Sequence, residues 1–335
     1  MAETRITNVV EPEVFTQYTV EPSIYKSRFF QSGAIVQNPV INNLLAGGGK
    51  TFTLPFWQDV GGTSGDVPSE TVATTINNLA ASEQVARRQF REKAWGANDL
   101  ASILAGDRPL DSLQNMVTSY WANAFEMNAI ASIQGLFADN DANDAGDLIN
   151  DISGESGAAA VISDSAVIDA QAKLGENGTV GRNDLNNGGF AAIVMHPATY
   201  AVLRKANAFD YLPIGDQERP VETYMGMAVI VTRNVPVDTG VYDTYIVKNG
   251  ALQYGFTASG YEPTELDRDA STGFGIDVLY TRRVFAIHPL GMAWQEETVT
   301  GGISPSDANL KLAANWDRAF NAENMGVVLL KHKIA

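Results

Sequence analysis

The spacing of apolar residues predicts one long helix in the first half of the chain. Between Pro109 and Phe137, apolar side chains recur at steps of three and four residues, as on a helix with one buried face: Leu110, Leu113, Val117, Tyr120, Trp121, Ala124, Met127 and Ala131. Pro109 suits the first turn, and Asp107 or Arg108 is expected to cap it. At ~1.5 Å per residue the helix would be about 40 Å long, which indicates a spine rather than a small-domain helix.

The residues before this helix predict extended structure. Residues 1–38 are polar, lack a helical period and are punctuated by prolines, so they are expected to form an arm. Residues 51–57 alternate and are rich in β-formers, and a second extended segment covers 71–90 beyond a Gly-rich loop at 61–68. Two long polar strands cannot form a core alone, so they predict a protruding hairpin that lies on another surface.

The rest of the chain alternates short apolar runs with turn residues. Strands are expected at 190–195, 227–232, 242–248, 251–256, 275–289 and 327–334, and helices at 163–174 (capped by Ser163 or Asp164), 197–208 and between 305 and 314. Asn249-Gly250 between two β runs predicts a hairpin. The acidic, Gly- and Ala-rich stretch 139–160 is expected to be a flexible surface loop. This order is α+β and lacks a βαβ rhythm.

Composition narrows the function. The 335 residues are 45% hydrophobic, which suffices for a sizeable core, and 19% charged, a low value that suits a subunit burying surface against neighbours. The net charge of -16 argues against a reader of nucleic-acid sequence but not against a DNA container. The absence of Cys excludes disulfides and thiol chemistry. No signal peptide or apolar run of ~20 residues is found, so assembly in a cytoplasm is expected.

Two motifs resemble ligand sites but lack essential residues. Residues 46–51 contain Gly-Gly-Gly-Lys-Thr, like the end of a phosphate-binding loop, yet Leu44 or Leu45 stands where a Gly is required and a strand is expected to follow. An acidic run resembles a calcium loop, but Asp144 replaces its Gly and Asn150 its bidentate Glu: Asp139, Asp141, Asn143, Asp144 and Asp147. A hinge and a solvated loop are expected instead.

No catalytic constellation is present. His196, His288 and His332 lack the His-Glu-x-x-His spacing, and no Gly-x-Ser-x-Gly elbow occurs, so a structural role at strand ends is expected for each His. Asn177-Gly-Thr matches the glycosylation pattern and is expected to be a turn. We predict no catalytic, cofactor-binding or metal-binding residues.

The densest basic cluster consists of Arg87, Arg88, Arg91 and Lys93. Only Phe90 and Trp95 are available nearby for base stacking, which does not favour a nucleic-acid surface. Two interpretations stay open: a solvated strand face, or a charge-complementary contact with the acidic surface of a neighbouring subunit.

An ordered set of stretches resembles the major capsid proteins of tailed bacteriophages. They cover most of the chain after Gly33: 99–109, 117–121, 133–137, 196–203, 224–231, 280–294, 315–320 and 326–330. The most recognisable are Asp99-Leu-Ala-Ser-Ile-Leu-Ala-Gly-Asp-Arg-Pro, which leads into the long helix, and His196-Pro-Ala-Thr-Tyr-Ala-Val-Leu. No single stretch is specific, but their order is.

The resemblance implies the Hong Kong ninety-seven-type capsid fold, which encapsulins share. It implies an N-terminal arm at 1–46, an extended hairpin loop at 47–98, a peripheral domain with the spine helix at 99–160 and 275–335, and an axial domain at 161–274. It also implies pentamers and hexamers whose arms and hairpins cross subunit boundaries. Deletion of residues 1–38 is therefore expected to leave a folded monomer that assembles poorly. Lys50 and Lys93 lie at the ends of the hairpin rather than at its tip, so no Lys–Asn cross-link is expected.

The function implied is that of a non-enzymatic major capsid protein, which self-assembles into the icosahedral head shell of a tailed phage around double-stranded DNA. Scaffolding, portal and decoration proteins are the expected further partners, with no membrane and no cofactor. The expected location is the virion capsid, after assembly in the bacterial cytoplasm. The alternatives are an encapsulin-like compartment with a ferritin-like cargo, a calcium-binding surface protein using residues 139–147, and a P-loop enzyme.

Overall fold

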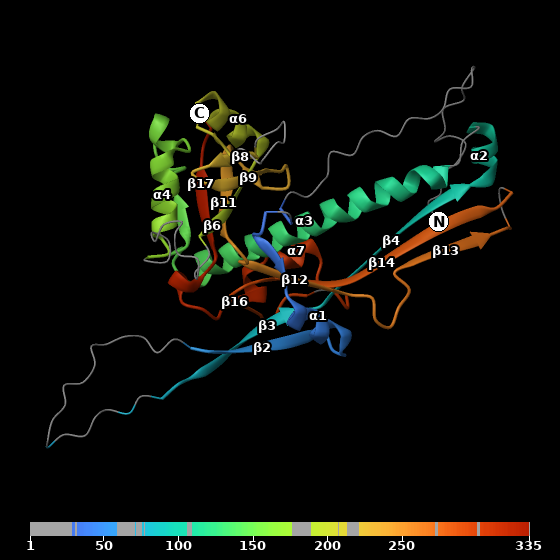
Figure 1. Ribbon diagram of the computed structural model, residues 1–335, viewed down its shortest axis with the longest axis horizontal. Helices are drawn as coiled ribbons and strands as arrows, with labels where there is room; N and C mark the ends of the chain where they lie inside the picture. Colours follow the sequence, from blue (N-terminus) through green and yellow to red (C-terminus); the bar gives the residue numbers. More distant parts are fainter. Residues whose placement is uncertain are drawn as a thin grey trace.

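The computed structural model describes residues 29–30, 32–58, 71, 76, 78–105, 109–175, 189–206, 208–212, 221–271, 274–299 and 302–334. In this part of the chain the structure has two large sheets, two small ones and the long helix α3 (Pro109–Asn143), which confirms the predicted mixed α+β content (Figure 1). Most of the expected arm, the Gly-rich loop 61–68, Asp107, Arg108 and Asn177 lie outside the described residues. None of the described helices combines the length and hydropathy of a membrane span.

The eight-stranded sheet gathers strands from distant parts of the chain. Its order is β5-β17-β11-β6-β9-β8-β7, and β10 pairs with β11. The strands are β5 (Ile149–Asp151), β6 (Phe190–Met195), β7 (Asp210–Leu212), β8 (Val221–Tyr224), β9 (Met227–Val231), β10 (Val237–Asp238), β11 (Val241–Lys248) and β17 (Val327–His332). Helix α4 (Asp164–Ala172) lies beside β17 and β5, and helix α6 (Pro197–Lys205) follows β6 (Figure 1). Ser163 caps α4, as predicted.

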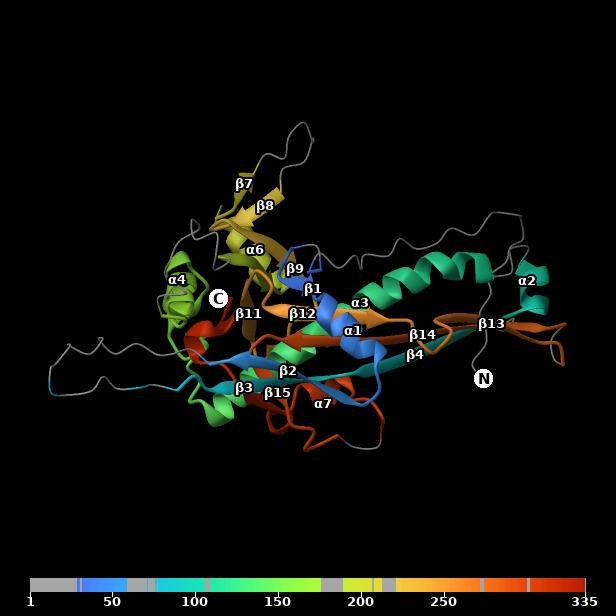
Figure 2. The same ribbon diagram turned by 60° about the horizontal axis from the view of Figure 1, so that its bottom comes forward.

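The five-stranded sheet is built on one long strand, β14 (Ile276–Pro289). Strand β4 (Gln89–Asn98) pairs antiparallel with one edge of β14, from Ile276↔Asn98 to Phe285↔Gln89. The other edge of β14 carries β12 (Leu252–Thr257) and then β13 (Thr264–Asp269), and β1 (Ile35–Gln37) pairs parallel with β12. Helix α3 runs along β14 and β4 in both views, so helix and sheet form one elongated body (Figures 1 and 2).

The remaining elements are short. A two-stranded ribbon joins β2 (Thr51–Trp57) to β3 (Ala81–Arg87), and a second pairs β15 (Met292–Trp294) with β16 (Trp316–Arg318). The short helices are α1 (Pro39–Ala46), α2 (Asp99–Ala105) and α7 (Asp307–Leu310). Single 3-10 turns cover Gly157–Ala160, Ala313–Asn315 and Ala322–Asn324.

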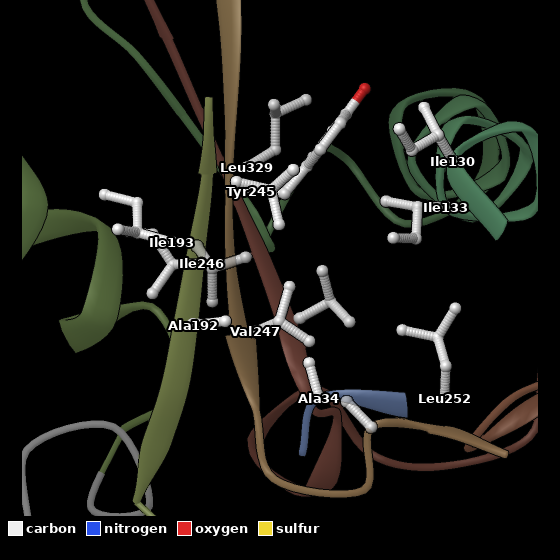
Figure 3. Close-up of a cluster of buried hydrophobic side chains, with 14 of the residues drawn as sticks. Ala34, Ile130, Ile133, Ala192, Ile193, Tyr245, Ile246, Val247, Leu252 and Leu329 are labelled. Carbon is white, nitrogen blue, oxygen red and sulfur yellow. The ribbon is translucent and has the colours of Figure 1, made fainter. Parts of the chain in front are cut away.

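The core lies where α3 meets both large sheets. Ile130 and Ile133 of α3 lie across from Tyr245 and Leu329 of the eight-stranded sheet, and all four are at most 2% exposed (Figure 3). On the five-stranded sheet, Trp121 Nε1 donates a 3.1 Å hydrogen bond to Thr281 Oγ1. Each buried aliphatic side chain contributes ~1.5–3 kcal/mol. The predicted apolar face is confirmed only in part: Val117, Trp121 and Ala131 are buried, whereas Tyr120 and Met127 are 41% and 43% exposed.

Helix α3 is longer than predicted, and the acidic stretch after it is not a flexible loop. The helix ends at Asn143 rather than Phe137, and β5 follows at Ile149. Asp139 and Asn140 are 1% exposed and Leu148 is fully buried. The prediction failed because it weighed the Asp, Gly and Ala content and could not see that β5 pairs in parallel with β17, far along the chain.

The turn at Asn249-Gly250 forms, but the predicted hairpin is wrong. Ala251 N donates to Lys248 O at 3.3 Å, and Gly250 has a positive φ of 69°, but Asn249 lacks the positive φ that the Asn-Gly hairpin turn also requires. The two flanking strands then enter different sheets, since β11 pairs with β6 and β17 whereas β12 pairs with β1 and β14. The turn is therefore the crossing point between the two large sheets.

Helix α1 was not expected within the extended N-terminal region. Asn38 caps it by accepting a 2.8 Å hydrogen bond from Val40 N, and Pro39 occupies its first turn. Ile41 and Leu45 are buried against Ala286 of β14. The first 46 residues are thus not extended throughout, because this apolar helix face binds the sheet.

Strand pairing links segments that the sequence assigned to different domains, and the domain division itself stays a prediction. β17 pairs with β11, although the sequence grouped residues 327–332 with the spine helix. β12 and β13 pair with β14, although the sequence placed residues 252–269 in the axial domain. Strand pairing here joins residues far apart in the chain, which local patterns do not reveal.

Candidate assembly surfaces

The β2–β3 ribbon extends from the body at one end of the molecule, where the sequence predicted a hairpin (Figure 1). One face of β2 packs inward. Phe52 and Leu54 pack against the cluster that α1 forms with Ala286 of β14. The ring of Phe56 meets that of Phe320 edge to face, with 4.7 Å between the ring centroids. The other face is exposed and includes Trp57, which is 68% exposed. A large aromatic side chain on the open side of a two-stranded ribbon is a contact point for another molecule.

The opposite end is formed by the outer part of β14 with β13, β4 and α2 (Figures 1 and 2). Arg268 joins these elements, with ion pairs to Asp99 at 2.6 Å and to Asp277 at 2.8 Å. Three large apolar side chains are exposed nearby, at 58%, 70% and 76%: Leu266, Ile103 and Phe274. Each end of the molecule therefore presents apolar side chains away from the core.

The basic cluster proves to be mostly internal. Arg87 is 3% exposed and donates to Glu296 Oε1 at 2.9 Å, to Lys50 O at 3.0 Å and to Ile303 O at 2.8 Å. Burial lowers the pKa of Arg87, and the Glu296 carboxylate opposes this shift.

The other two arginines of the cluster also make intramolecular bonds. Arg88 is 8% exposed and donates to Leu44 O and Gly47 O, and Arg91 pairs with Asp307 at 3.1 Å. A solvated face is therefore the wrong interpretation for Arg87 and Arg88, whereas Lys93 at the end of the cluster is exposed.

The acidic segment at the end of α3 is neutralised by an arginine of the same chain. Arg318 pairs with Asp144 at 3.0 Å and with Asp147 at 2.8 Å. Asp139 is buried, which raises the pKa of its carboxyl, and its Oδ1 accepts from Asn143 at 2.6 Å. Nowhere in the described ranges do three His, Asp or Glu side chains gather as a metal site requires. The guanidinium of Arg318 occupies the position between carboxylates where a bound cation would be expected.

The three histidines have structural contacts. His196 Nδ1 accepts from Ala198 N at 3.1 Å and so caps α6. His332 Nε2 lies 2.9 Å from Thr244 Oγ1 of the neighbouring strand. His288 is 1% exposed on β14, and burial lowers its pKa to about 4. The structural role expected for each His stays a prediction.

The segment that resembles a phosphate-binding loop connects a helix to a strand, the reverse of the order that motif requires. Its carbonyl groups are taken by arginines: Gly47 O accepts from Arg88 and Lys50 O from Arg87. The expected strand after it, β2, is confirmed. The segment anchors the base of the ribbon.

The fold is that of phage capsid proteins. The capsid of Ralstonia phage GP4 superposes with a TM-score of 0.61 at 11% identity, over 96% of this chain and 96% of that chain. The holo-SrpI encapsulin complex from Synechococcus elongatus PCC 7942 gives a TM-score of 0.53 at 8% identity, over 96% of this chain and 93% of that chain. At these identities both comparisons show a shared fold and nothing further.

Sequence similarity then assigns the family. The major capsid protein of Bacillus phage SPP1 is 32% identical over 343 residues, an alignment that covers 100% of this chain and 99% of that protein. No model of a known protein family matches the chain. The chain belongs to the family of tailed-phage major capsid proteins, as the resemblance in its sequence indicated.

Proposed function

We propose that this protein is the subunit that tiles the head shell of a tailed phage, and that its two projecting ends hold it in the lattice. The full-length similarity to the major capsid protein of Bacillus phage SPP1 is the observation that carries the proposal. The exposed Trp57 at one end and the exposed Phe274 at the other support it, because each end would bind a different neighbour.

Assembly would rest on many modest contacts rather than on one large interface. A subunit held at both ends is bound by avidity, since each contact raises the effective concentration of the other. Unlike surfaces that meet head to tail form rings when the rotation closes, which is how pentamers and hexamers would arise. The acidic chain, with a net charge of -16, would repel packaged double-stranded DNA and leave it free to move.

The finer assignment follows the same reasoning. We propose an arm at 1–46, a hairpin at 47–98, a peripheral domain at 99–160 and 275–335, and an axial domain at 161–274 in the Hong Kong ninety-seven manner. The role is structural rather than enzymatic. The expected partners are further copies, a scaffolding protein, a portal and decoration proteins, with assembly in the host cytoplasm and residence in the virion capsid.

Negative-stain electron microscopy of the purified protein, alone and with the scaffolding protein of its phage, tests the proposal. Closed uniform shells or capsomer rings are expected. Trp57→Ser should leave the monomer folded, because the side chain is 68% exposed, but should reduce shell yield. A wild-type protein that stays a monodisperse monomer under every condition would refute shell assembly.

A further inference from the structure

Helix α3 contacts the two large sheets along two successive stretches of its length. In the stretch 128–137 every residue except Gln134 is buried, and the ring of Phe137 stacks on that of Tyr245 in the eight-stranded sheet at 5.8 Å. The stretch before it packs on the five-stranded sheet, where the ring of Phe125 meets that of Phe285 at 4.9 Å. Figure 1 shows the helix passing from one sheet to the other. The angle between the sheets is therefore set where these two stretches of α3 meet.

A buried carboxylate lies at this junction. Glu126 is 8% exposed and forms no ion pair with the Lys and Arg side chains of the described residues. Its Oε1 instead accepts hydrogen bonds from the hydroxyl of Thr232 and, at 3.1 Å, from Asn234 Nδ2. Asn234 Nδ2 also donates to Asn123 Oδ1 at 3.0 Å, one turn earlier on α3. Polar side chains thus join helix and loop at the junction.

The loop that carries these donors, between β9 and β10, is tied to the eight-stranded sheet. Thr232 N donates to Met195 O of β6 at 3.0 Å, and Val235 is 2% exposed within the main core. Asn234 N donates to Thr232 Oγ1 at 3.2 Å, which fixes the shape of the loop itself. The loop is therefore an extension of the eight-stranded sheet that reaches α3 just before the stretch on which that sheet packs.

The chemistry of this contact permits more than one position of the loop. A carboxylate has about four lone-pair positions on its two oxygens, yet only Oε1 of Glu126 accepts hydrogen bonds from the described residues. Hydroxyl and amide donors tolerate a broad range of directions at such an oxygen, whereas close-packed apolar side chains fit in one arrangement. A small rotation of the eight-stranded sheet about this point would move the donors towards Oε2 and keep the hydrogen bonds.

We propose that Glu126, Thr232 and Asn234 form an adjustable joint, which lets the angle between the two large sheets differ between copies of this chain. The inference rests on the proposed function, in which identical subunits form both pentamers and hexamers. Rings of five and of six require different angles between neighbours. The joint supplies part of that difference within the subunit, at a loop position of the kind where hinges occur. Glu126 is its positioning residue.

High-resolution electron microscopy of wild-type shells tests the joint without any substitution. Copies from pentamers and hexamers are superposed on the five-stranded sheet, and the eight-stranded sheets are expected to differ by a rotation about the region of Glu126. The Asn234 amide is expected nearer to one carboxylate oxygen in pentamers and nearer to the other in hexamers. The same Glu126–Asn234 geometry in every copy would overturn the inference and leave shell assembly intact. Failure of the wild type to form shells would instead count against the proposed function.

A substitution at the joint supplies a second measurement. Glu126→Gln keeps the size of the side chain but replaces one acceptor oxygen by an NH2 donor, so one position of the loop is lost. The yield of closed shells should fall by about tenfold, the equivalent of one hydrogen bond to a charged group, and open sheets or tubes should replace them. Glu155→Gln, at an exposed residue, is the matched control and should form closed shells like the wild type.

The kind of assembly separates a joint from a merely structural contact. A structural contact would lower the urea midpoint and the yield together but leave the assemblies closed. Closed shells of wild-type diameter from Glu126→Gln, at any yield, would therefore overturn the inference. If this variant fails to fold, the comparison of pentamer and hexamer copies in wild-type shells decides the question.

Discussion

Gly135 of helix α3 lies directly against Trp316 of β16. A methyl group at Gly135 would overlap both Nε1 of Trp316 and the carbonyl oxygen of Leu310. Those two atoms are joined by a 2.7 Å hydrogen bond in which Trp316 donates. The close approach lets α3 sit on the α7–β16 region, so the missing side chain is a packing requirement.

Gly135→Ala is therefore expected to destabilise the subunit, although Ala favours helices. Overpacking a core costs ~1–3 kcal/mol, and the overlap also separates the Trp316–Leu310 pair, so a loss near 3 kcal/mol is expected. The measurement is the urea midpoint of the unassembled subunit. Gly154→Ala is the control, because nothing lies within 4 Å of an added Cβ there. Equal midpoints for both variants would disprove the packing argument.

The buried arginine at the base of the ribbon gives a second prediction. Arg87→Met keeps the volume but leaves Glu296 and the carbonyl groups of Lys50 and Ile303 without their donor. Removing one partner of a buried pair costs ~3–5 kcal/mol; because Glu296 is 31% exposed, we expect about 3 kcal/mol. Lys93→Met, at the exposed end of the same basic cluster, should change the unfolding free energy by less than ~0.5 kcal/mol. Similar losses at both positions would contradict the internal role of Arg87.

This contrast shows what the sequence could and could not predict. The long helix, β2, β6, β14 and β17 were predictable because each carries an apolar period or run that local burial explains. The burial and ion pairing of Arg87 were not predictable, because its partners Glu296 and Ile303 lie 209 and 216 residues further along the chain.

Turn chemistry was likewise correct but incomplete. Asn249-Gly250 does form a turn, with positive φ at Gly250 alone. Which strand pairs with which is decided by the helices and strands that cover each sheet, and this information is spread over the chain.

Helix α1 did carry local signals, namely Asn38, Pro39 and Gly47, and these were sufficient to predict a short helix.

The half-buried Asp243 and the buried His288 should have opposite effects on how the unfolding free energy depends on pH. Burial raises the pKa of Asp243 to about 6, with Lys331 opposing the shift and Asp151 and Asp238 adding to it. The native state therefore holds a proton that the unfolded state releases at pH ~3.9, so the contribution of Asp243 is lost as pH rises from about 4 to 6. His288 acts in the opposite direction: its pKa is lowered to about 4, so stability is lost as pH falls below ~6.5.

Asp243→Asn should remove the contribution of this carboxyl to the pH dependence of the unfolding free energy. The pKa of this carboxyl differs by about two between the folded and unfolded states, and a difference of one in pKa corresponds to ~1.36 kcal/mol. Relative to the wild type, the variant is therefore expected to gain about 2–3 kcal/mol of unfolding free energy between pH 4 and pH 7. Urea unfolding at both pH values measures this difference. Parallel pH profiles for variant and wild type would show that Asp243 does not titrate with a raised pKa in the folded subunit.

Residues from Phe29 onward in the N-terminal region are expected to be required for folding. Phe29 is fully buried in the main core, and Phe30 meets Tyr254 edge to face at 5.4 Å. β1 follows and pairs with β12. Deletion of residues 2–38 removes all of these contacts, which argues against the sequence-based expectation that such a deletion leaves a folded monomer.

Losing a buried Phe costs ~3–5 kcal/mol alone, which is a large part of a typical stability of ~5–15 kcal/mol. The 2–38 deletion should therefore yield unfolded or aggregated protein. Deletion of residues 2–28 keeps Phe29 and β1, so its urea midpoint should match that of the wild type while shell yield falls. Normal shells from the shorter deletion would show that residues 2–28 are dispensable for assembly. A folded subunit from the longer deletion would show that β1 contributes little to the core.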